Sequence, residues 1–493
     1  MKKLITLICT GALAASCAFA QTTPPVTPVV GATPAAVPVQ RFPRPPQTPE
    51  QIAAAKANAD ALNADHQNMM DQLHITQPLR GGKNGTDSTV ANFANFDESK
   101  ANPYPVWPDP LTFKDGTKVK TPADWTKRRK EIVEDFDREV YGRVPKNVPK
   151  VTWSVVKDID TVADGIPVNL KWVKGHVDNS TYPAIDVDIE VTLTVPKSAT
   201  HAVPVIMVFG GPDFLHPRPA GGGFGGGFGP PRTPAAGAPP PPKPAEQQIL
   251  EKGWAYATLN PGSVQADNGN GLTKGIIGLC NKGQYRKPED WGALRAWAWG
   301  ADRALDYFET NKAVNAKEVA IEGHSRYGKG ALVTLAYDQR MATAYVSSSG
   351  EAGAKPSRRD FGETVENITG NAEYHWMAGN FLKYGGPLHW NDLPVDSHEL
   401  IAMCAPRPVF ISGGKIAKVN MDGWVDARGM FMAADAAGPV YALLGKKPMP
   451  IHDFPKMETL VADGDIAFRQ HSSGHTDVPN WPYFLDFASK YFK

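Results

Sequence analysis

Residues 319–329 read Val319-Ala320-Ile321-Glu322-Gly323-His324-Ser325-Arg326-Tyr327-Gly328-Lys329, and this stretch decides the fold. Its apolar start predicts a buried strand, and the glycines around Ser325 predict a sharp turn from that strand into a helix. Such a turn lifts the serine Oγ above the sheet, where it can act as a nucleophile. The common Gly-x-Ser-x-Gly spacing is not met, because Tyr327 stands in place of the second glycine. Arg326 and Lys329, two cations so close to the serine, suggest an anionic substrate.

Strand and helix patterns alternate on both sides of this turn. Continuous apolar runs at 205–209 and 255–259 predict buried strands, 291–308 predicts an amphipathic helix, and 409–412 predicts a later strand. Alternating segments within 151–194 predict two or three antiparallel strands before them. This order predicts an α/β-hydrolase fold: a three-layer αβα sandwich with a mainly parallel, doubly wound sheet and antiparallel N-terminal strands.

The start of the chain predicts export. Residues 1–20 combine two lysines, an apolar core and Ala18-Phe19-Ala20, which is typical of a secretory signal peptide. Residues 21–47 are rich in proline and predict a disordered spacer. Cys17 would suit a lipoprotein, but the three residues before it form a poor processing site. We therefore expect a periplasmic or secreted protein, with residues 48–493 as a single catalytic domain.

Further elements are predicted within that domain. The sequence indicates helices over 48–72, over 123–141 with Gly142 at its end, and over 481–492. Residues 217–245 consist largely of glycine and proline and predict a surface insertion. Two cysteines follow the leader, Cys280 and Cys404, and the sequence leaves open whether they pair.

Composition excludes several classes of partner. A formal net charge of +1 over 493 residues gives no electrostatic basis for binding nucleic acid. Past the leader, no segment has the ~20 apolar residues needed to cross a bilayer. No Cys/His cluster has zinc spacing, and no glycine-rich segment follows a strand in a phosphate-binding pattern, so we expect no metal and no cofactor. The expected protein is a monomer whose partner is its substrate.

A serine nucleophile requires a histidine base and a carboxylate that orients it. The strongest histidine candidate is His475, which follows Gly474 shortly before the last predicted helix; His452 and His471 are competitors. The order standard for this fold places the acid after the penultimate strand, where Asp422 and Asp426 stand.

The run Gly-x-Ser-Arg-x-Gly-Lys resembles the signature of the glucuronoyl esterases, which cleave esters between glucuronic acid on xylan and lignin alcohols. The resemblance covers most of the chain from about residue 95 onward, through blocks at 102–105, 358–367, 393–398 and 405–408. It implies an exported serine esterase acting on (4-O-methyl-)glucuronic acid esters. Two other functions stay open: another α/β-hydrolase, such as an acetyl xylan esterase or a peptidase, and a catalytically inactive carbohydrate-binding homologue.

The resemblance bears on the choice of acid. Some family members carry a glutamate 23 residues after the serine, but that position is Ser348 here. Glu351 lies three residues further on. Bacterial members have an Asp-x-Trp segment similar to Asp422-Gly423-Trp424, which favours Asp422, with Asp426 and Glu351 as alternatives.

The resemblance also implies which residues contact the substrate. The backbone N–H of Arg326 should face the developing oxyanion, and in the family its guanidinium donates there too. Lys329 follows Ser325 by one helical turn, and in the family it holds sugar hydroxyls. Glu373, Trp376 and Trp424 are further sugar-pocket candidates. Glu363 matches a bacterial family block, but it could instead brace Arg358 or Arg359.

Overall fold

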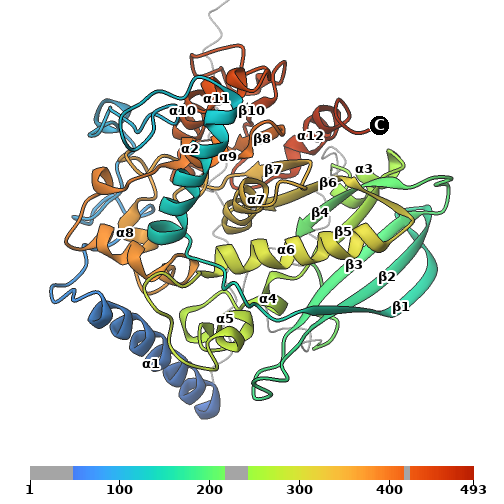
Figure 1. The fold of residues 1–493 in the computed structure, drawn as a ribbon, viewed down its shortest axis with the longest axis horizontal. Coiled ribbons are helices and arrows are strands. Elements are labelled where there is room, and N and C mark those ends of the chain that lie inside the picture. Colours follow the sequence, from blue (N-terminus) through green and yellow to red (C-terminus); the bar gives the residue numbers. More distant parts are fainter. Residues whose placement is uncertain (1–47, 217–241, 416–421) are drawn as a thin grey trace, which may run out of the picture. The chain divides into compact units, whose positions relative to one another are not determined.

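The computed structural model describes residues 48–216, 242–415 and 422–493 (Figure 1). Contacts divide the chain into Met1–Ile52 and Ala53–Lys493, and the strands of the described residues all belong to the second unit. The predicted signal peptide, spacer and most of the 217–245 insertion lie outside the described residues. The last residue of that insertion is already structured, since Ala245 begins helix α3 (Ala245–Glu251).

The strands form one sheet in the order β1-β2-β3-β5-β4-β6-β7-β8-β10-β9. Every neighbouring pair from β5 across to β10 is parallel, whereas β1, β2 and β3 pair antiparallel. The predicted fold class is therefore confirmed. The bounds are β1 Val151–Ala163, β2 Ile166–Val177, β3 Asp188–Pro196, β4 Val203–Phe209, β5 Ala255–Leu259, β6 Val314–His324, β7 Thr343–Ser347, β8 Val409–Gly413, β9 Leu460–Val461 and β10 Ile466–Gln470.

Helices cover both faces of the sheet, which gives the three layers. Alternate residues of each strand point to opposite faces of the sheet. Apolar side chains therefore lie on both faces, and their burial against the helices stabilises one helix layer on each face. Met207, Ile321, Val346 and Ile411 belong to the core cluster that also contains α6 (Ala293–Thr310), α7 (Arg326–Tyr337), α9 (Ser397–Cys404) and α10 (Ala427–Ala436). Ile206, Ala320, Tyr345 and Phe410 pack with residues of α3 and α12 (Trp481–Ala488).

The predicted helix at 123–141 is present, but its last turn differs. Thr121 caps α2 (Pro122–Asp135) through a capping box with Asp124, and a π-helical turn, Phe136–Val140, continues it. Gly142 then ends the helix with φ +83°, and a Cβ there would lie 2.3 Å from the Asp290 carbonyl oxygen. Only glycine fits this position.

The other helices are α1 (Pro49–Gln72), α4 (Pro261–Val264), α5 (Gly275–Cys280), α8 (Val365–Ile368) and α11 (Gly438–Leu443). Helix α12 ends four residues before the predicted residue 492. Strands β7, β9 and β10 were not predicted. Within the three described ranges, no helix is long and apolar enough to cross a membrane. Cys280 and Cys404 are both free thiols.

Candidate active site

Ser325 occupies a strained turn between β6 and α7, with φ +60° and ψ −126°. Two close approaches make this turn possible. A Cβ on Gly323 would lie 2.0 Å from the Tyr327 carbonyl oxygen, and a Cβ on Gly328 would lie 2.6 Å from the Ser347 carbonyl oxygen. The unusual spacing in the sequence is thus explained, because Gly328 rather than residue 327 passes close to β7.

His475 and Asp422 form a hydrogen-bonded pair, with 2.6 Å between Nδ1 and Oδ1. Asp422 is fully buried, and its Oδ2 accepts from Ser348 Oγ (2.6 Å) and from the Gly414 backbone N–H. Burial alone would raise the pKa of Asp422, but these donors and the His475 ring hold it below its usual value. An ionised Asp422 keeps the proton on Nδ1 and leaves Nε2 of His475 free to accept one.

His324 links this pair to the serine, which it directly precedes in the chain. Its ring lies against His475, with 4.3 Å between centroids, and its Nδ1 is 3.0 Å from Ser347 Oγ. Burial and the neighbouring His475 lower the pKa of His324 to about 4, so its ring is neutral near pH 7. The structure therefore places the His475–Asp422 pair beside the residue that directly precedes Ser325.

The competing acids and bases have other partners. Glu351 is buried against Lys355 (2.9 Å) and Ser357, and Asp426 is held by Arg359 (2.7 Å) while it caps α10. His452 is exposed and contacts Asp435, and Nε2 of His471 lies 2.8 Å from the Thr476 carbonyl oxygen. None of these carboxylates contacts His475 in the described part of the chain.

Both cations after the serine are neutralised, which the sequence did not indicate. Arg326 Nη1 donates to Asp267 (2.7 Å), and Lys329 Nζ donates to Glu363 (2.8 Å) and to the Glu351 carbonyl (2.5 Å). The two cations lie 5.4 and 5.5 Å from the centroid of the Trp376 ring. Each cation thus already has a carboxylate partner, and the anionic substrate suggested by these two cations stays a prediction.

Asp267 is the residue that sequence reasoning missed. It accepts hydrogen bonds from Arg326, from His375 (2.9 Å) and from the Trp376 indole N–H (2.7 Å). Burial would raise the pKa of Asp267, but these partners hold it well below its usual value. Its position eight residues after β5, toward the carboxyl edge of the sheet, was the only signal available.

The remaining predicted residues belong to the same cluster of side chains. Burial and the nearby Glu363 raise the pKa of Glu373 to about 8, and its Oε2 has no partner among the described residues.

Glu363 binds Lys329 and the Glu351 N–H (3.0 Å), so it does not brace Arg358 or Arg359. Those arginines pair with Asp396 and Asp426. Trp424 is half-buried against Gly85, and its carbonyl accepts from the Glu363 N–H (2.8 Å).

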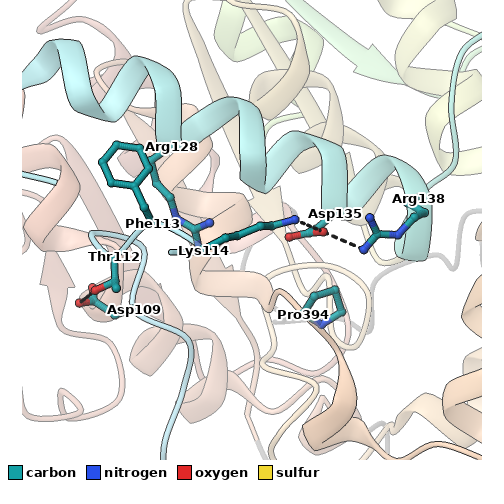
Figure 2. A pocket seen from close by; sticks show the side chains of 8 residues that line it. All are labelled: Asp109, Thr112, Phe113, Lys114, Arg128, Asp135, Arg138 and Pro394. Carbon is teal, nitrogen blue, oxygen red and sulfur yellow. Dashed lines mark hydrogen bonds and ion pairs between the residues drawn. The ribbon is translucent and has the colours of Figure 1, made fainter. Parts of the chain in front are cut away.

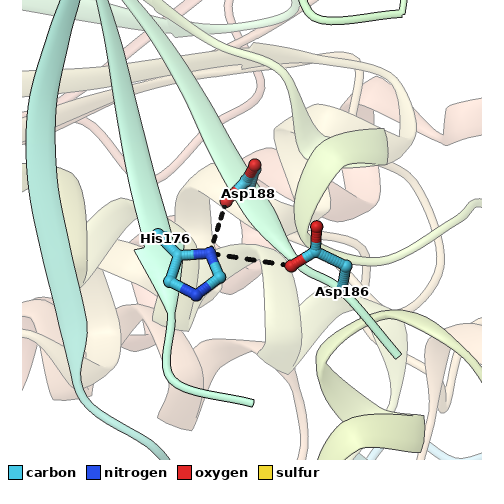
Figure 3. Close-up of side chains that lie close together, drawn as sticks. All are labelled: His176, Asp186 and Asp188. Carbon is cyan, nitrogen blue, oxygen red and sulfur yellow. Dashed lines mark hydrogen bonds and ion pairs between the residues drawn. The ribbon is translucent and has the colours of Figure 1, made fainter. Parts of the chain in front are cut away.

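Two other features share no residue with this site. A cavity of about 390 Å³ holds Lys114 and Arg138, which both contact Asp135 (Figure 2). Nδ1 of His176 on β2 lies 2.8 Å from Asp188, the first residue of β3, and 3.6 Å from Asp186 just before it (Figure 3). Lys174 contacts the second Asp188 oxygen (3.0 Å), so this cluster is accounted for as a network of ion pairs.

The parallel sheet and the strained serine turn define an α/β-hydrolase. A family model for fungal glucuronyl esterases matches residues 245–445. A carbohydrate esterase from an unknown prokaryotic organism is 32% identical over 410 residues, 80% of this chain and 91% of the relative. A 4-O-methyl-glucuronoyl methylesterase from Wolfiporia cocos is 28% identical over 69% of this chain and 72% of the relative.

Solved structures agree with these sequence relatives. A glucuronoyl esterase from Teredinibacter turnerae superposes with a TM-score of 0.77 at 38% identity, over 87% of this chain and 99% of that one. A glucuronoyl esterase from Solibacter usitatus gives a TM-score of 0.67 at 31% identity, over 80% and 99%. The chain belongs to the glucuronoyl esterase family, as the resemblance in the sequence implied.

Proposed function

We propose that the protein is a serine esterase that hydrolyses esters of (4-O-methyl-)glucuronic acid, such as lignin–carbohydrate links to glucuronoxylan. The observation that carries this proposal is the pair of cations after Ser325, each held by a carboxylate against the Trp376 ring. A uronic acid ester is uncharged and rich in hydroxyls. Such an ester suits a pocket that offers hydrogen-bond donors and acceptors but no net charge.

Ser325 is the proposed nucleophile and His475 the base, held in its tautomer by Asp422. Nε2 of His475 accepts the Ser325 proton as Oγ attacks the ester carbonyl, and then returns it to the departing alcohol. The glucuronoyl–serine ester is hydrolysed by a water that His475 activates in the same way. The 2.6 Å contact between His475 and Asp422 supports these roles.

Arg326 is the proposed donor to the oxyanion, through its backbone N–H at the start of α7 and through its guanidinium. Asp267 fixes the guanidinium next to the serine. Lys329, Glu363, Glu373, Trp376 and Trp424 are the proposed contacts to the sugar. Glu373 can donate from its protonated form at pH 7, because its pKa is raised to about 8.

We also propose that the protein is exported and acts as a monomer. The leader pattern at 1–20 supports export. Mass spectrometry of the secreted protein should find an N-terminus at Gln21, and light scattering should give the mass of one chain.

The test is hydrolysis of benzyl glucuronate beside 4-nitrophenyl acetate by the purified protein. We expect cleavage of the glucuronate ester with a clear preference in kcat/KM, and Ser325→Ala should abolish it while circular dichroism stays unchanged. Cleavage of the acetate alone would instead identify an acetyl esterase. Cleavage of neither would identify an inactive homologue.

A further inference from the structure

A second cavity has a volume of about 310 Å³. Three parts of the chain line it: helix α1 contributes Asp65, the segment after β5 contributes Gly269, Asn270 and Thr273, and the segment after α5 contributes Gln284 and Tyr285. None of the residues proposed for catalysis or for holding the uronate lines this cavity.

The cavity shares its walls with the active site. Gly269 follows Asp267, the partner of Arg326, by two residues, and a Cβ on Gly269 would lie 2.8 Å from the Tyr374 ring. The Tyr374 hydroxyl donates to Asp65 Oδ1 (2.5 Å), while the next two residues, His375 and Trp376, bind Asp267. The same two short segments, 267–271 and 373–376, therefore border both spaces.

The lining has the chemistry of a carbohydrate subsite. It offers amides from Asn270 and Gln284, hydroxyls from Thr273 and Tyr285, and one carboxylate, but no lysine or arginine. Tyr285 is 45% exposed and presents an aromatic ring to a ligand. This lining differs from the cavity of Figure 2, whose walls carry three cations.

Asp65 adds a polar atom that requires a partner. Its side chain is buried, and its Oδ2 accepts no hydrogen bond from any described residue. Buried carboxylate oxygens are normally hydrogen-bonded. A ligand hydroxyl that enters the cavity would supply the missing donor.

We propose that this cavity is a subsite for a neutral sugar residue of the glycan chain that carries the esterified uronate. The identity of that chain rests on the proposed function. The size of the cavity suits a small sugar unit, and a lining with one carboxylate and no lysine or arginine disfavours an anionic ligand. The subsite would position the glycan while the uronate ester occupies the space beside Ser325.

The test compares two substrates in matched variants. We expect Gln284→Ala and Tyr285→Ala to raise KM for a glucuronate ester carried on xylotriose by about 3- to 10-fold, the contribution of one hydrogen bond or ring contact. KM for benzyl glucuronate, which has no glycan, should not change. Gln247→Ala and Tyr483→Ala, on α3 and α12, are the controls and should change neither. Equal effects on both substrates, or none on either, would overturn the subsite.

A binding measurement separates this proposal from the proposed function. Unesterified xylotetraose should give saturation-transfer NMR signals with the wild-type protein, and these should weaken in Gln284→Ala and Tyr285→Ala. Absence of binding to the wild type would overturn the subsite even if benzyl glucuronate is cleaved. Binding without any ester hydrolysis would support the subsite and reject the proposed function.

Discussion

At the scale of single residues, two aspartates four positions apart have different surroundings. Asp422 is buried against His475, whereas Asp426 is buried against Arg359. Their position in the loop after strand β8 does not separate them, although the resemblance of Asp422-Gly423-Trp424 to a family segment favours Asp422. Their partners do, because an acid that orients the base must contact the imidazole and Asp426 does not.

We therefore expect Asp422→Asn to lower kcat by roughly 10⁴ while the protein stays folded, as in other triads that lose the orienting acid. Asp426→Asn should act differently. It leaves the buried Arg359 less well paired and should lower the free energy of unfolding by up to about 3–5 kcal/mol. Steady-state kinetics and urea denaturation on both variants measure the two effects. A normal kcat in Asp422→Asn would show that the acid lies elsewhere.

Glu373 provides a prediction about pH. Its pKa is raised to about 8 by burial and by Glu363, so its carboxyl is protonated at pH 7 and ionises above pH 8. Ionisation removes a hydrogen-bond donor from the sugar pocket, so KM for benzyl glucuronate should rise between pH 7 and 9. Glu373→Gln keeps a donor and should show a flat KM over the same range. A rise of equal size in both proteins would exclude Glu373 as its source.

At the scale of elements, the ends of neighbouring strands bring distant residues together. Ser348 follows β7 and Asp422 lies beyond β8, yet Ser348 Oγ donates to the Asp422 carboxylate at 2.6 Å. The Ser348 N–H also donates to the Ser412 carbonyl in β8 (2.8 Å). The position where some relatives carry a glutamate is therefore occupied here by a serine that supports the aspartate.

This geometry predicts a rescue. A carboxylate at position 348 would start from the same strand end and could reach His475 when Asp422 is neutralised. We expect the double variant Ser348→Glu with Asp422→Asn to recover at least about tenfold in kcat over Asp422→Asn alone, a small part of the ~10⁴ that the acid contributes. Ser348→Gln in the same background is the uncharged control. Equal activity of the two double variants would rule out the rescue.

The sequence predicted elements where the local pattern was strong. The continuous apolar runs of β4 and β5 and the glycines around Ser325 mark strands and a turn by themselves. Strand β7 was not predicted because Thr343–Ser347 has only five residues, of which two are polar, and so lacks a continuous apolar run. The role of Asp267 was not predicted because it depends on contacts with Arg326 and Trp376, which lie 59 and 109 residues away in the sequence. Such contacts exist only once the sheet has brought these segments together.

At the scale of the whole molecule, buried carboxyl groups determine how stability depends on pH. Burial raises the pKa of Asp302, Glu373 and Glu399 to about 8. In the unfolded chain these groups ionise near pH 4, so between pH 4 and 8 the native state binds more protons. The stability that they provide is complete below pH 4 and is lost as pH rises toward 8.

Buried histidines have the opposite effect, but only at lower pH. Burial lowers the pKa of His66, His324, His375, His398 and His471 below the unfolded value of about 6.5. The unfolded chain therefore binds more histidine protons only below that pH. Between pH 6.5 and 8, of these two sets of groups, the carboxyl groups alone make the free energy of unfolding depend on pH.

We thus expect Tm to fall as pH rises from 6.5 to 8, with each raised carboxyl contributing at most about 1.4 kcal/mol per pH unit. Asp302→Asn should make the slope shallower, because an amide does not ionise. Glu309→Gln, an exposed position on the same helix α6, should leave the slope unchanged. Calorimetry at several pH values measures all three proteins. Identical slopes would show that Asp302 titrates normally.

The two neutralised cations beside Ser325 have a consequence for turnover. Under the proposed reaction, an uncharged ester enters a pocket whose positive charges are already matched by Asp267 and Glu363. Hydrolysis then leaves a carboxylate anion in the same space, where Arg326 and Lys329 are already paired and compensate poorly for its lost hydration. The anion is more stable in bulk water than in the pocket. Product inhibition should accordingly be weak, so that the enzyme continues to work as free glucuronate accumulates around it.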